Sequence, residues 1–283
     1  SQEKRPPPTA AWGTRKSRPS TSRRPQAVPT YRLHVAYDGA TYHGFARQKE
    51  LTTVQGTIED ALATVLRTPV FTTGAGRTDA GVHALGQVMS FTLGTALDDL
   101  PALQRRLNAL CAPTIAVLEL AEAPAGFDAR FSAASRTYEY AILTRQVHDP
   151  FSRHVAWHHA PPDRGDDLDA AAMHEAAQAL LGTHDFSSFG RVPEGATPVR
   201  NLLAISVERT EDLVVIRLTA NAFIRQMVRS IVGTLVKVGE GDHPPGWVAE
   251  VLEARDRAAA GPVAPPHGLF LVEVDYPEEL VRG

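Results

Sequence analysis

The sequence predicts an α+β protein of two similar ferredoxin-like halves, with mainly antiparallel sheets joined around a central active-site cleft. Apolar residues recur with strand and helix periods in the order β-α-β-β-α-β over residues 31–120. Residues 136–274 repeat that order loosely. We therefore expect three parts, namely a disordered basic tail (1–30), an N-terminal half (31–145) and a C-terminal half (146–283).

The first half is expected to contain two helices and four strands. Each strand is a short run of apolar residues beside turn residues such as Asp38-Gly39. Each helix has apolar residues three or four positions apart and begins at a capping residue, Thr52 or Thr53 for the first and Asp98 or Asp99 for the second. In order, the elements are expected at 31–37 (strand), 54–66 (helix), 69–73 and 87–93 (strands), 99–110 (helix) and 114–120 (strand).

The second half is expected to use the same alternation with one extra helix. Its first helix should be capped by Asp166 or Asp167 and reach Leu181, and its middle strands should pair as a hairpin around 210–212. The remaining elements are expected at 136–143, 202–208 and 213–219 (strands), 223–235 and 245–254 (helices) and 269–274 (strand).

Charge is distributed unevenly along the chain. Residues 1–30 contain seven basic residues, one acid and six prolines without apolar periodicity, which predicts a disordered tail. Three interpretations of this tail stay open: an extension without function, an arm that attracts RNA weakly by its charge, or a transit peptide. The rest of the chain has 22 basic and 31 acidic residues, so its net charge does not indicate a nucleic-acid-binding protein. If nucleic acid binds, the arginines that hold it must cluster in one basic cleft of an acidic protein.

Two further bounds concern the compartment. Cys111 is the only cysteine, so no disulfide forms within the chain. No apolar run approaches the roughly 18 residues that a membrane helix requires. We expect a cytoplasmic protein that does not associate with membranes.

The most unusual segment of the sequence is the loop Gly74–Ala84, which has three glycines in its first eight residues and carries Arg77 and Asp79. Its pattern matches neither common glycine-rich phosphate motif, so phosphate binding by itself is a weak interpretation. The alternative is a strand-connecting loop in which Arg77 and Asp79 only satisfy each other.

Two other patterns carry candidate site residues. Arg225 and Arg229 are four positions apart on an expected apolar helix, where the two like charges repel each other and a bound anion would stabilise them. The alternative is that both arginines belong to a solvent-exposed stripe of the helix. Tyr138 and Tyr140 lie on one face of their strand and are either site residues or half-buried packing residues. His154, His158 and His159 lack a cysteine or a third ligand in register, so we predict no metal site.

These segments together resemble the TruA family of tRNA pseudouridine synthases. The resemblance is carried in chain order over about residues 31–277 and is specific because many motifs occur together. Two departures are Ala46, which stands where the family usually has Gln, and the basic tail, which lies outside the family pattern. The matching segments are 37–45, 54–55, 76–84, 129–133, the Arg-x-Tyr-x-Tyr strand at 136–140, 185–189, 221–233 and 268–277.

The resemblance implies an isomerase that converts uridine to pseudouridine in tRNA without a cofactor. It implies that Asp79 is the catalytic carboxylate, that Tyr138 lies against the uracil or handles a proton, and that Arg229 keeps Asp79 ionised. Tyr140 is expected to be structural. Arg77 should contact phosphate or prop the stem open while the uridine is flipped out.

The resemblance also implies partners. Members act as homodimers on the anticodon arm, at tRNA positions 38, 39 and 40. Arg47 and Arg225 are further candidate contacts to tRNA. Two other functions stay open from the residues themselves. One is a non-catalytic RNA-binding protein with two ferredoxin-like halves, although the expected sheet-surface aromatics are not evident. The other is a glycosidic hydrolase, which would need a second acid near Asp79.

Overall fold

The structure is a computed structural model that describes residues 28–160, 168–192 and 195–281. The tail predicted for 1–30 therefore lies almost wholly outside the described residues, and its last residue, Thr30, begins the first strand. No described helix has the length and apolar character needed to cross a membrane.

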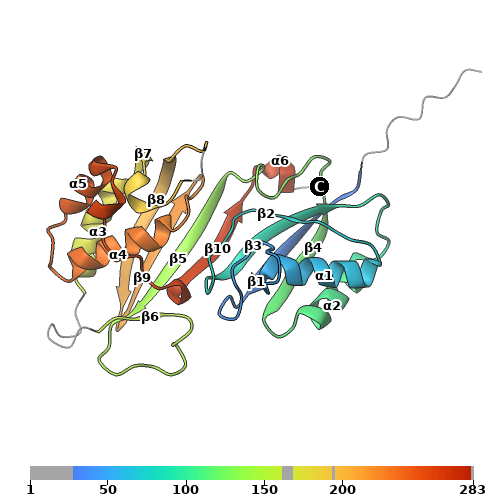
Figure 1. Cartoon of the computed structure of the whole chain (residues 1–283), viewed down its shortest axis with the longest axis horizontal. Helices are drawn as coiled ribbons and strands as arrows, with labels where there is room; N and C mark the ends of the chain where they lie inside the picture. The colour runs from blue at the N-terminus through green and yellow to red at the C-terminus, as the bar shows by residue number, and fades with distance from the viewer. Residues whose placement is uncertain (1–27, 161–167, 193–194, 282–283) are drawn as a thin grey trace, which may run out of the picture.

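All ten strands belong to one sheet, which runs through the length of the molecule (Figure 1). Its path is β4-β1-β3-β10-β5-β9-β8-β7, with β2 paired to β3 and β6 paired to β5. Only the β10–β3 and β5–β6 pairs are parallel. The α+β class with a mainly antiparallel sheet is thus confirmed. The strands are β1 (Thr30–Tyr37), β2 (Thr73–Gly74), β3 (His83–Thr92), β4 (Ile115–Ala123), β5 (Ser135–Leu143), β6 (Trp157–His158), β7 (Gly182–Asp185), β8 (Val199–Thr210), β9 (Leu213–Ala220) and β10 (Leu269–Asp275).

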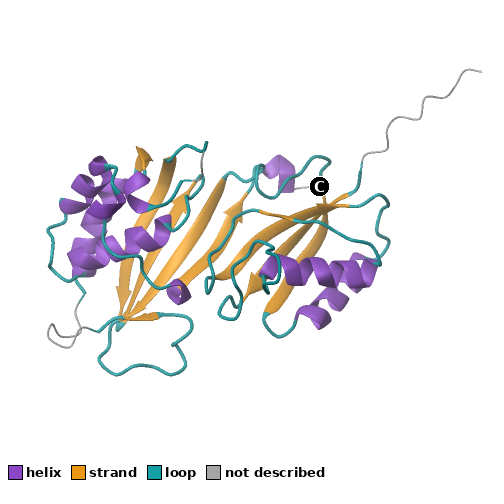
Figure 2. Cartoon of the chain, in the orientation of Figure 1, coloured by secondary structure: helices purple, strands orange, loops and turns teal. Residues whose placement is uncertain are grey.

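The helices gather in two groups on the sheet, α1 with α2 at one end and α3, α4 and α5 at the other (Figure 2). The helices are α1 (Val54–Leu66), α2 (Leu100–Cys111), α3 (Ala170–Ala177), α4 (Met227–Gly239), α5 (Trp247–Ala254) and the short α6 (Glu278–Val281). Single 3-10 turns lie at Gln178–Leu180, Ser187–Phe189, Arg257–Ala259 and Pro266–Gly268.

Side-chain caps begin three of these helices. Thr53 accepts a hydrogen bond from Gly56 N at 3.2 Å, and Asp99 accepts one from Ala102 N at 2.8 Å, as the sequence predicts. Such a cap stabilises a helix by about 1 kcal/mol. The cap of α3 is Asp169, whereas the predicted Asp166 and Asp167 lie outside the described residues.

One apolar core continues along the whole sheet. It includes the fully buried Tyr31 of β1, Tyr140 of β5, Ile216 of β9 and Phe186 beside β7. The outer strands at the two ends therefore share a continuous packing layer with the central strands. Because β10, β5 and β3 lie in the middle of the sheet, loops at their ends meet near its centre.

Several predicted elements differ from the structure in their bounds. β3 begins at His83 rather than at 87, and α3 ends at Ala177 rather than at Leu181. Two further differences have a physical reason in the structure. The strand expected at 69–73 is reduced to β2, because the Thr72 N–H donates to the buried Glu59 carboxylate at 2.9 Å and is not available to a ladder. The helix expected at 223–235 begins only at Met227, because Gln226 has a left-handed backbone (φ 66°) that a regular helix cannot contain. The predicted hairpin of β8 and β9 is confirmed.

Candidate active site

Asp79 lies on the loop between β2 and β3, and the opening segment of the chain holds that loop in place. Phe45 N donates to Thr78 O at 3.0 Å, and the hydroxyls of Tyr37 and Thr78 share a hydrogen bond of 2.8 Å. Gly44 has a φ of 96°, and a Cβ there would lie 3.1 Å from Thr78 O. Both the backbone angle and the close approach require glycine, so the turn can press against the segment next to Asp79.

The carboxylate of Asp79 faces two arginines from a distant part of the chain. Arg229 Nη1 donates to Asp79 Oδ2 at 3.2 Å, and Arg225 Nε lies 3.8 Å from Asp79 Oδ1. The Asp79 side chain is 27% exposed and Arg229 is 14% exposed, whereas Arg225 is 68% exposed. The carboxylate is thus held by a largely buried partner and is still open to a ligand on one side. Asp79 pairs with these residues and not with Arg77, which removes the interpretation of a self-satisfied loop.

Arg229 is fixed from two directions. Its Nε donates to Ala264 O at 2.7 Å, and Ala264 N donates back to Arg229 O at 3.0 Å. One turn along α4, a Cβ on Gly233 would lie 1.8 Å from Pro262 O, so glycine is needed for this segment to lie against the helix. The guanidinium therefore meets Asp79 with one nitrogen already committed, which orients the other toward the carboxylate.

The prediction that Arg225 and Arg229 share one face of a helix is wrong. Arg225 precedes α4 and is separated from the helix by the left-handed Gln226. The two arginines nevertheless reach the same carboxylate.

Tyr138 and Tyr140 differ in their surroundings although both point to the same face of β5. Tyr140 is fully buried and donates to Pro265 O at 2.8 Å, as expected of a structural residue. The Tyr138 hydroxyl lies 3.5 Å from the position that a Cβ added to Gly76 would occupy. The ring of Tyr138 packs edge-to-face against that of Phe223, with the ring centroids 5.0 Å apart. Burial raises the pKa of Tyr138 above its ordinary value, with nearby Tyr37 adding to the effect. Tyr138 thus keeps its proton at neutral pH.

Arg136 is a site-building residue that the sequence reasoning missed. Its buried guanidinium donates to four carbonyl oxygens from three segments, with Nη1–Asn221 O at 2.8 Å, Nη2–Arg130 O at 2.6 Å, Nη2–Ala75 O at 3.0 Å and Nη1–Ala133 O at 3.2 Å. It therefore ties the start of the Asp79 loop to the segment before α4. The available signal was its position, because residue 136 shares a strand face with 138 and 140.

The other two candidate arginines are placed differently. Arg77 is exposed, and among the described residues its side chain forms no hydrogen bond or ion pair. Arg47 is tied to α1, because its guanidinium contacts Glu59 at 3.2 Å and Asp60 at 2.7 Å. Hydrogen bonding to Asp60 raises the pKa of Arg47. Arg77 is thus free for an anionic ligand, whereas the charge of Arg47 is already neutralised.

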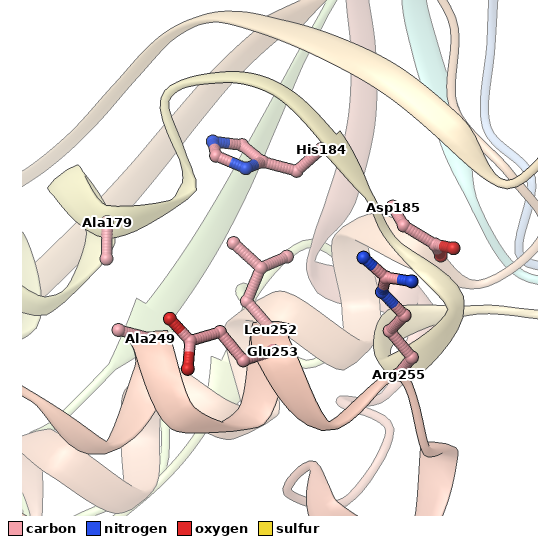
Figure 3. A pocket seen from close by; sticks show the side chains of 7 residues that line it. All are labelled: Ala179, His184, Asp185, Ala249, Leu252, Glu253 and Arg255. Carbon is pink, nitrogen blue, oxygen red and sulfur yellow. The ribbon is translucent and has the colours of Figure 1, made fainter.

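The two best-formed pockets of the described chain lie away from Asp79. One, of about 200 Å³, lies between β7 and α5 and is lined by Ala179, His184, Asp185, Ala249, Leu252, Glu253 and Arg255 (Figure 3). The hydrogen bond from Ser187 and the nearby Arg255 lower the pKa of Asp185, so its charge is already satisfied. The other pocket, of about 310 Å³, surrounds Arg47 and the start of α1. Neither brings together the residues that surround Asp79, so the chemistry of those residues identifies the site rather than cavity size.

Comparison with known proteins shows the family to which the chain belongs. A family model described as tRNA pseudouridine synthase matches residues 33–132 and 176–277, which include Asp79, Arg225 and Arg229. The chain is 46% identical over 253 residues to the tRNA pseudouridine synthase A of Rhizobium meliloti, covering 88% of this chain and 100% of that one. It is 45% identical over 252 residues to the tRNA pseudouridine synthase A of Hyphomonas neptunium, covering 88% and 99%.

A third relative is the tRNA pseudouridine synthase A of Frankia casuarinae, which is 48% identical over 255 residues and covers 88% of this chain and 89% of that one. A solved structure, the crystal structure of a Cbf5-Nop10-Gar1 complex, matches with a TM-score of 0.28 and 13% sequence identity, covering 82% of this chain and 69% of that one. This similarity is too low to support a conclusion about the fold or the function of this chain. The sequence relatives and the family model span both the Asp79 loop and the α4 segment that meets it. The chain therefore belongs to the family of tRNA pseudouridine synthases.

Proposed function

We propose that this protein is an isomerase that converts uridine to pseudouridine in tRNA, at positions 38, 39 and 40 of the anticodon arm, with Asp79 as the catalytic carboxylate. The observation that carries the proposal is the Asp79 carboxylate held by Arg229 at 3.2 Å yet open to a ligand on one side. The reaction breaks the C1′–N1 bond and forms a C1′–C5 bond, while C5 loses a proton and N1 gains one. Atoms balance within the substrate, so no cofactor is required.

Each neighbouring residue has a defined part in this proposal. Asp79 attacks C1′ of the ribose or C6 of the uracil, or takes a proton on the way to a glycal intermediate, and each of these needs the ionised form that Arg229 stabilises. Tyr138 presents a protonated hydroxyl and a ring edge to the flipped uracil. Arg77 and Arg225, both exposed, contact the RNA backbone around it.

We also propose that the sheet consists of two ferredoxin-like units joined around a central cleft at Asp79. The strands β1 to β4 lie in the spatial order β4-β1-β3-β2, and β5, β8, β9 and β10 lie in the order β10-β5-β9-β8. These two orders match each other. Because β5 spans Ser135–Leu143, the boundary between these units falls before residue 135 and not at 145. The unit of β1 to β4 then contains Asp79, and the other unit contains both of its arginine partners.

Two larger-scale features belong to the same proposal. The enzyme acts as a homodimer, so that one tRNA crosses both subunits, and it works in the cytoplasm, where its substrate is found. Light scattering at micromolar concentration checks the first, because a dimer has twice the 30.6 kDa mass of the chain.

The proposed activity is tested with an unmodified tRNA transcript that carries tritium at uridine C5 and with no added cofactor. Isomerisation breaks the C5–H bond, so tritium release should accompany pseudouridine, which is then mapped by position. Product at 38–40 supports the proposal, and product elsewhere corrects the positions. Free uracil would indicate a hydrolase, whereas tRNA binding without any product would indicate a non-catalytic RNA-binding protein.

Changing Arg229 separates its charge from its geometry. Arg229→Gln removes the cation beside Asp79 and should lower kcat by about 10²–10³-fold, the range found when one electrostatic partner of a reacting group is lost. Arg229→Lys keeps a charge but cannot reach Ala264 O and Asp79 together, so we expect an intermediate loss of about tenfold. Steady-state kinetics on both variants check this, and a fully active Gln variant would remove Arg229 from the mechanism.

A further inference from the structure

Arg191 lies directly opposite Arg225 in an isolated antiparallel bridge between two otherwise irregular segments. Arg191 N donates to Arg225 O at 3.0 Å. Residues opposed in this way project their side chains from the same face, with Cβ atoms about 4.5–5.5 Å apart. The side chain of Arg191 therefore starts beside that of Arg225, which reaches Asp79.

The position of Arg191 is built into the core. A Cβ on Gly190 would lie 2.6 Å from both Arg225 O and an Ile224 side-chain carbon, so only glycine lets the two segments approach this closely. Phe186 and Phe189, just before Gly190, are fully buried. The two arginines are consequently held next to each other by buried packing rather than by a chance surface contact.

This pairing is electrostatically unfavourable without an anion. Like charges directly opposite each other destabilise a strand pair. Arg191 is exposed, and its side chain has no hydrogen bond or ion pair within the part of the chain that the structure describes. Asp79 lies 3.8 Å from Arg225 and is already bonded to Arg229 at 3.2 Å. Arg225 therefore shares one carboxylate with Arg229, and Arg191 has no carboxylate partner among the described residues.

We propose that Arg191 and Arg225 form a binding site for a backbone phosphate of the RNA, next to the nucleotide that Asp79 attacks. This inference rests on the proposed function. A carboxylate that approaches a ribose is repelled by the phosphates on either side of that ribose, so cations must flank it. Arginine suits the task because its planar fork can hold two phosphate oxygens at once.

The test is the salt dependence of tRNA binding, which is measured without any reaction. Each neutralised phosphate contributes about 0.7–0.9 to the slope of log K against log [salt]. Arg191→Gln should reduce the slope by about that amount, and it should weaken binding about fivefold near 0.1 M salt. Arg191→Lys should keep most of the slope. Arg105→Gln is the matched control, because Arg105 is exposed on α2 in the other helix group and should leave the slope unchanged.

The outcomes separate this inference from the proposed function. An unchanged slope for Arg191→Gln, or an equal change for Arg105→Gln, overturns the phosphate site even if the wild type forms pseudouridine. A reduced slope for Arg191→Gln with the Lys variant close to wild type supports it even if no pseudouridine forms. Thermal unfolding of each variant should match the wild type, because neither arginine side chain is buried; a reduced slope accompanied by unfolding of Arg191→Gln, but not of Arg191→Lys, counts against the site.

Discussion

Replacing Asp79 with asparagine should lower kcat for pseudouridine formation by about four orders of magnitude or more, the scale seen when a bond-forming group is removed. Asparagine has the same shape but no negative charge, so it cannot attack the substrate. Binding should be retained, because the loop position depends on Thr78 and Gly44 rather than on the carboxylate. Single-turnover tritium release and a filter-binding titration on the same preparation check both parts.

The matched control for this experiment is Asp98→Asn. Asp98 is exposed, and its side chain forms no hydrogen bond or ion pair with any described residue. Its replacement removes the same charge and should leave kcat within about twofold of the wild type, since surface changes of this kind have small effects. Activity in Asp79→Asn within tenfold of the wild type would contradict the assignment of Asp79 as the catalytic residue.

Arg136→Met should destabilise the protein by about 3–5 kcal/mol, because it removes every side-chain donor that the buried Arg136 supplies to four carbonyl oxygens in three segments. The Ala75 carbonyl would lose both its contact to Nε at 3.2 Å and its contact to Nη2 at 3.0 Å. The kcat of the variant should fall by more than the loss of folded protein explains, since these contacts connect the Asp79 loop to the segment before α4. Urea unfolding measures the first effect, and kcat at a temperature where the variant is folded measures the second.

Two variants make the Arg136 experiment specific. Arg136→Lys has three donors on one nitrogen and should recover only part of the stability. Arg130→Met is the neighbouring control, because the Arg130 side chain is exposed and only its backbone oxygen meets Arg136. It should change the free energy of unfolding by less than about 0.5 kcal/mol. A loss below 1 kcal/mol for Arg136→Met would show that the three segments hold together without it.

Local patterns in the sequence were sufficient for most elements. The alternation in β9 and its turn to β8 predicted the hairpin, and Thr53 and Asp99 predicted the starts of α1 and α2. These features depend on residues within a few positions of one another. The candidate residues Asp79, Tyr138 and Arg229 were likewise identified from motifs that are contiguous in the chain.

The errors came from competition over long distances. β2 is short because Glu59, from α1, takes the N–H of Thr72. The expected helix face of Arg225 and Arg229 was wrong because the chain turns at Gln226, yet both arginines still meet Asp79. Nothing in the local sequence around 190 or 225 indicates that these segments pair.

The sequence by itself thus determined the class of fold, most of the order of the elements and the candidate site residues, because periodicity, capping and motifs are local properties. Only the tertiary structure decided which charges meet. The pairing of Asp79 with Arg229, separated by 150 positions, and the three segments joined by Arg136 follow from how the sheet brings its central loops together. Whether the arginines form the basic cluster that the uneven charge predicts depends on the folded chain, because a count of charged residues does not say which of them lie close together.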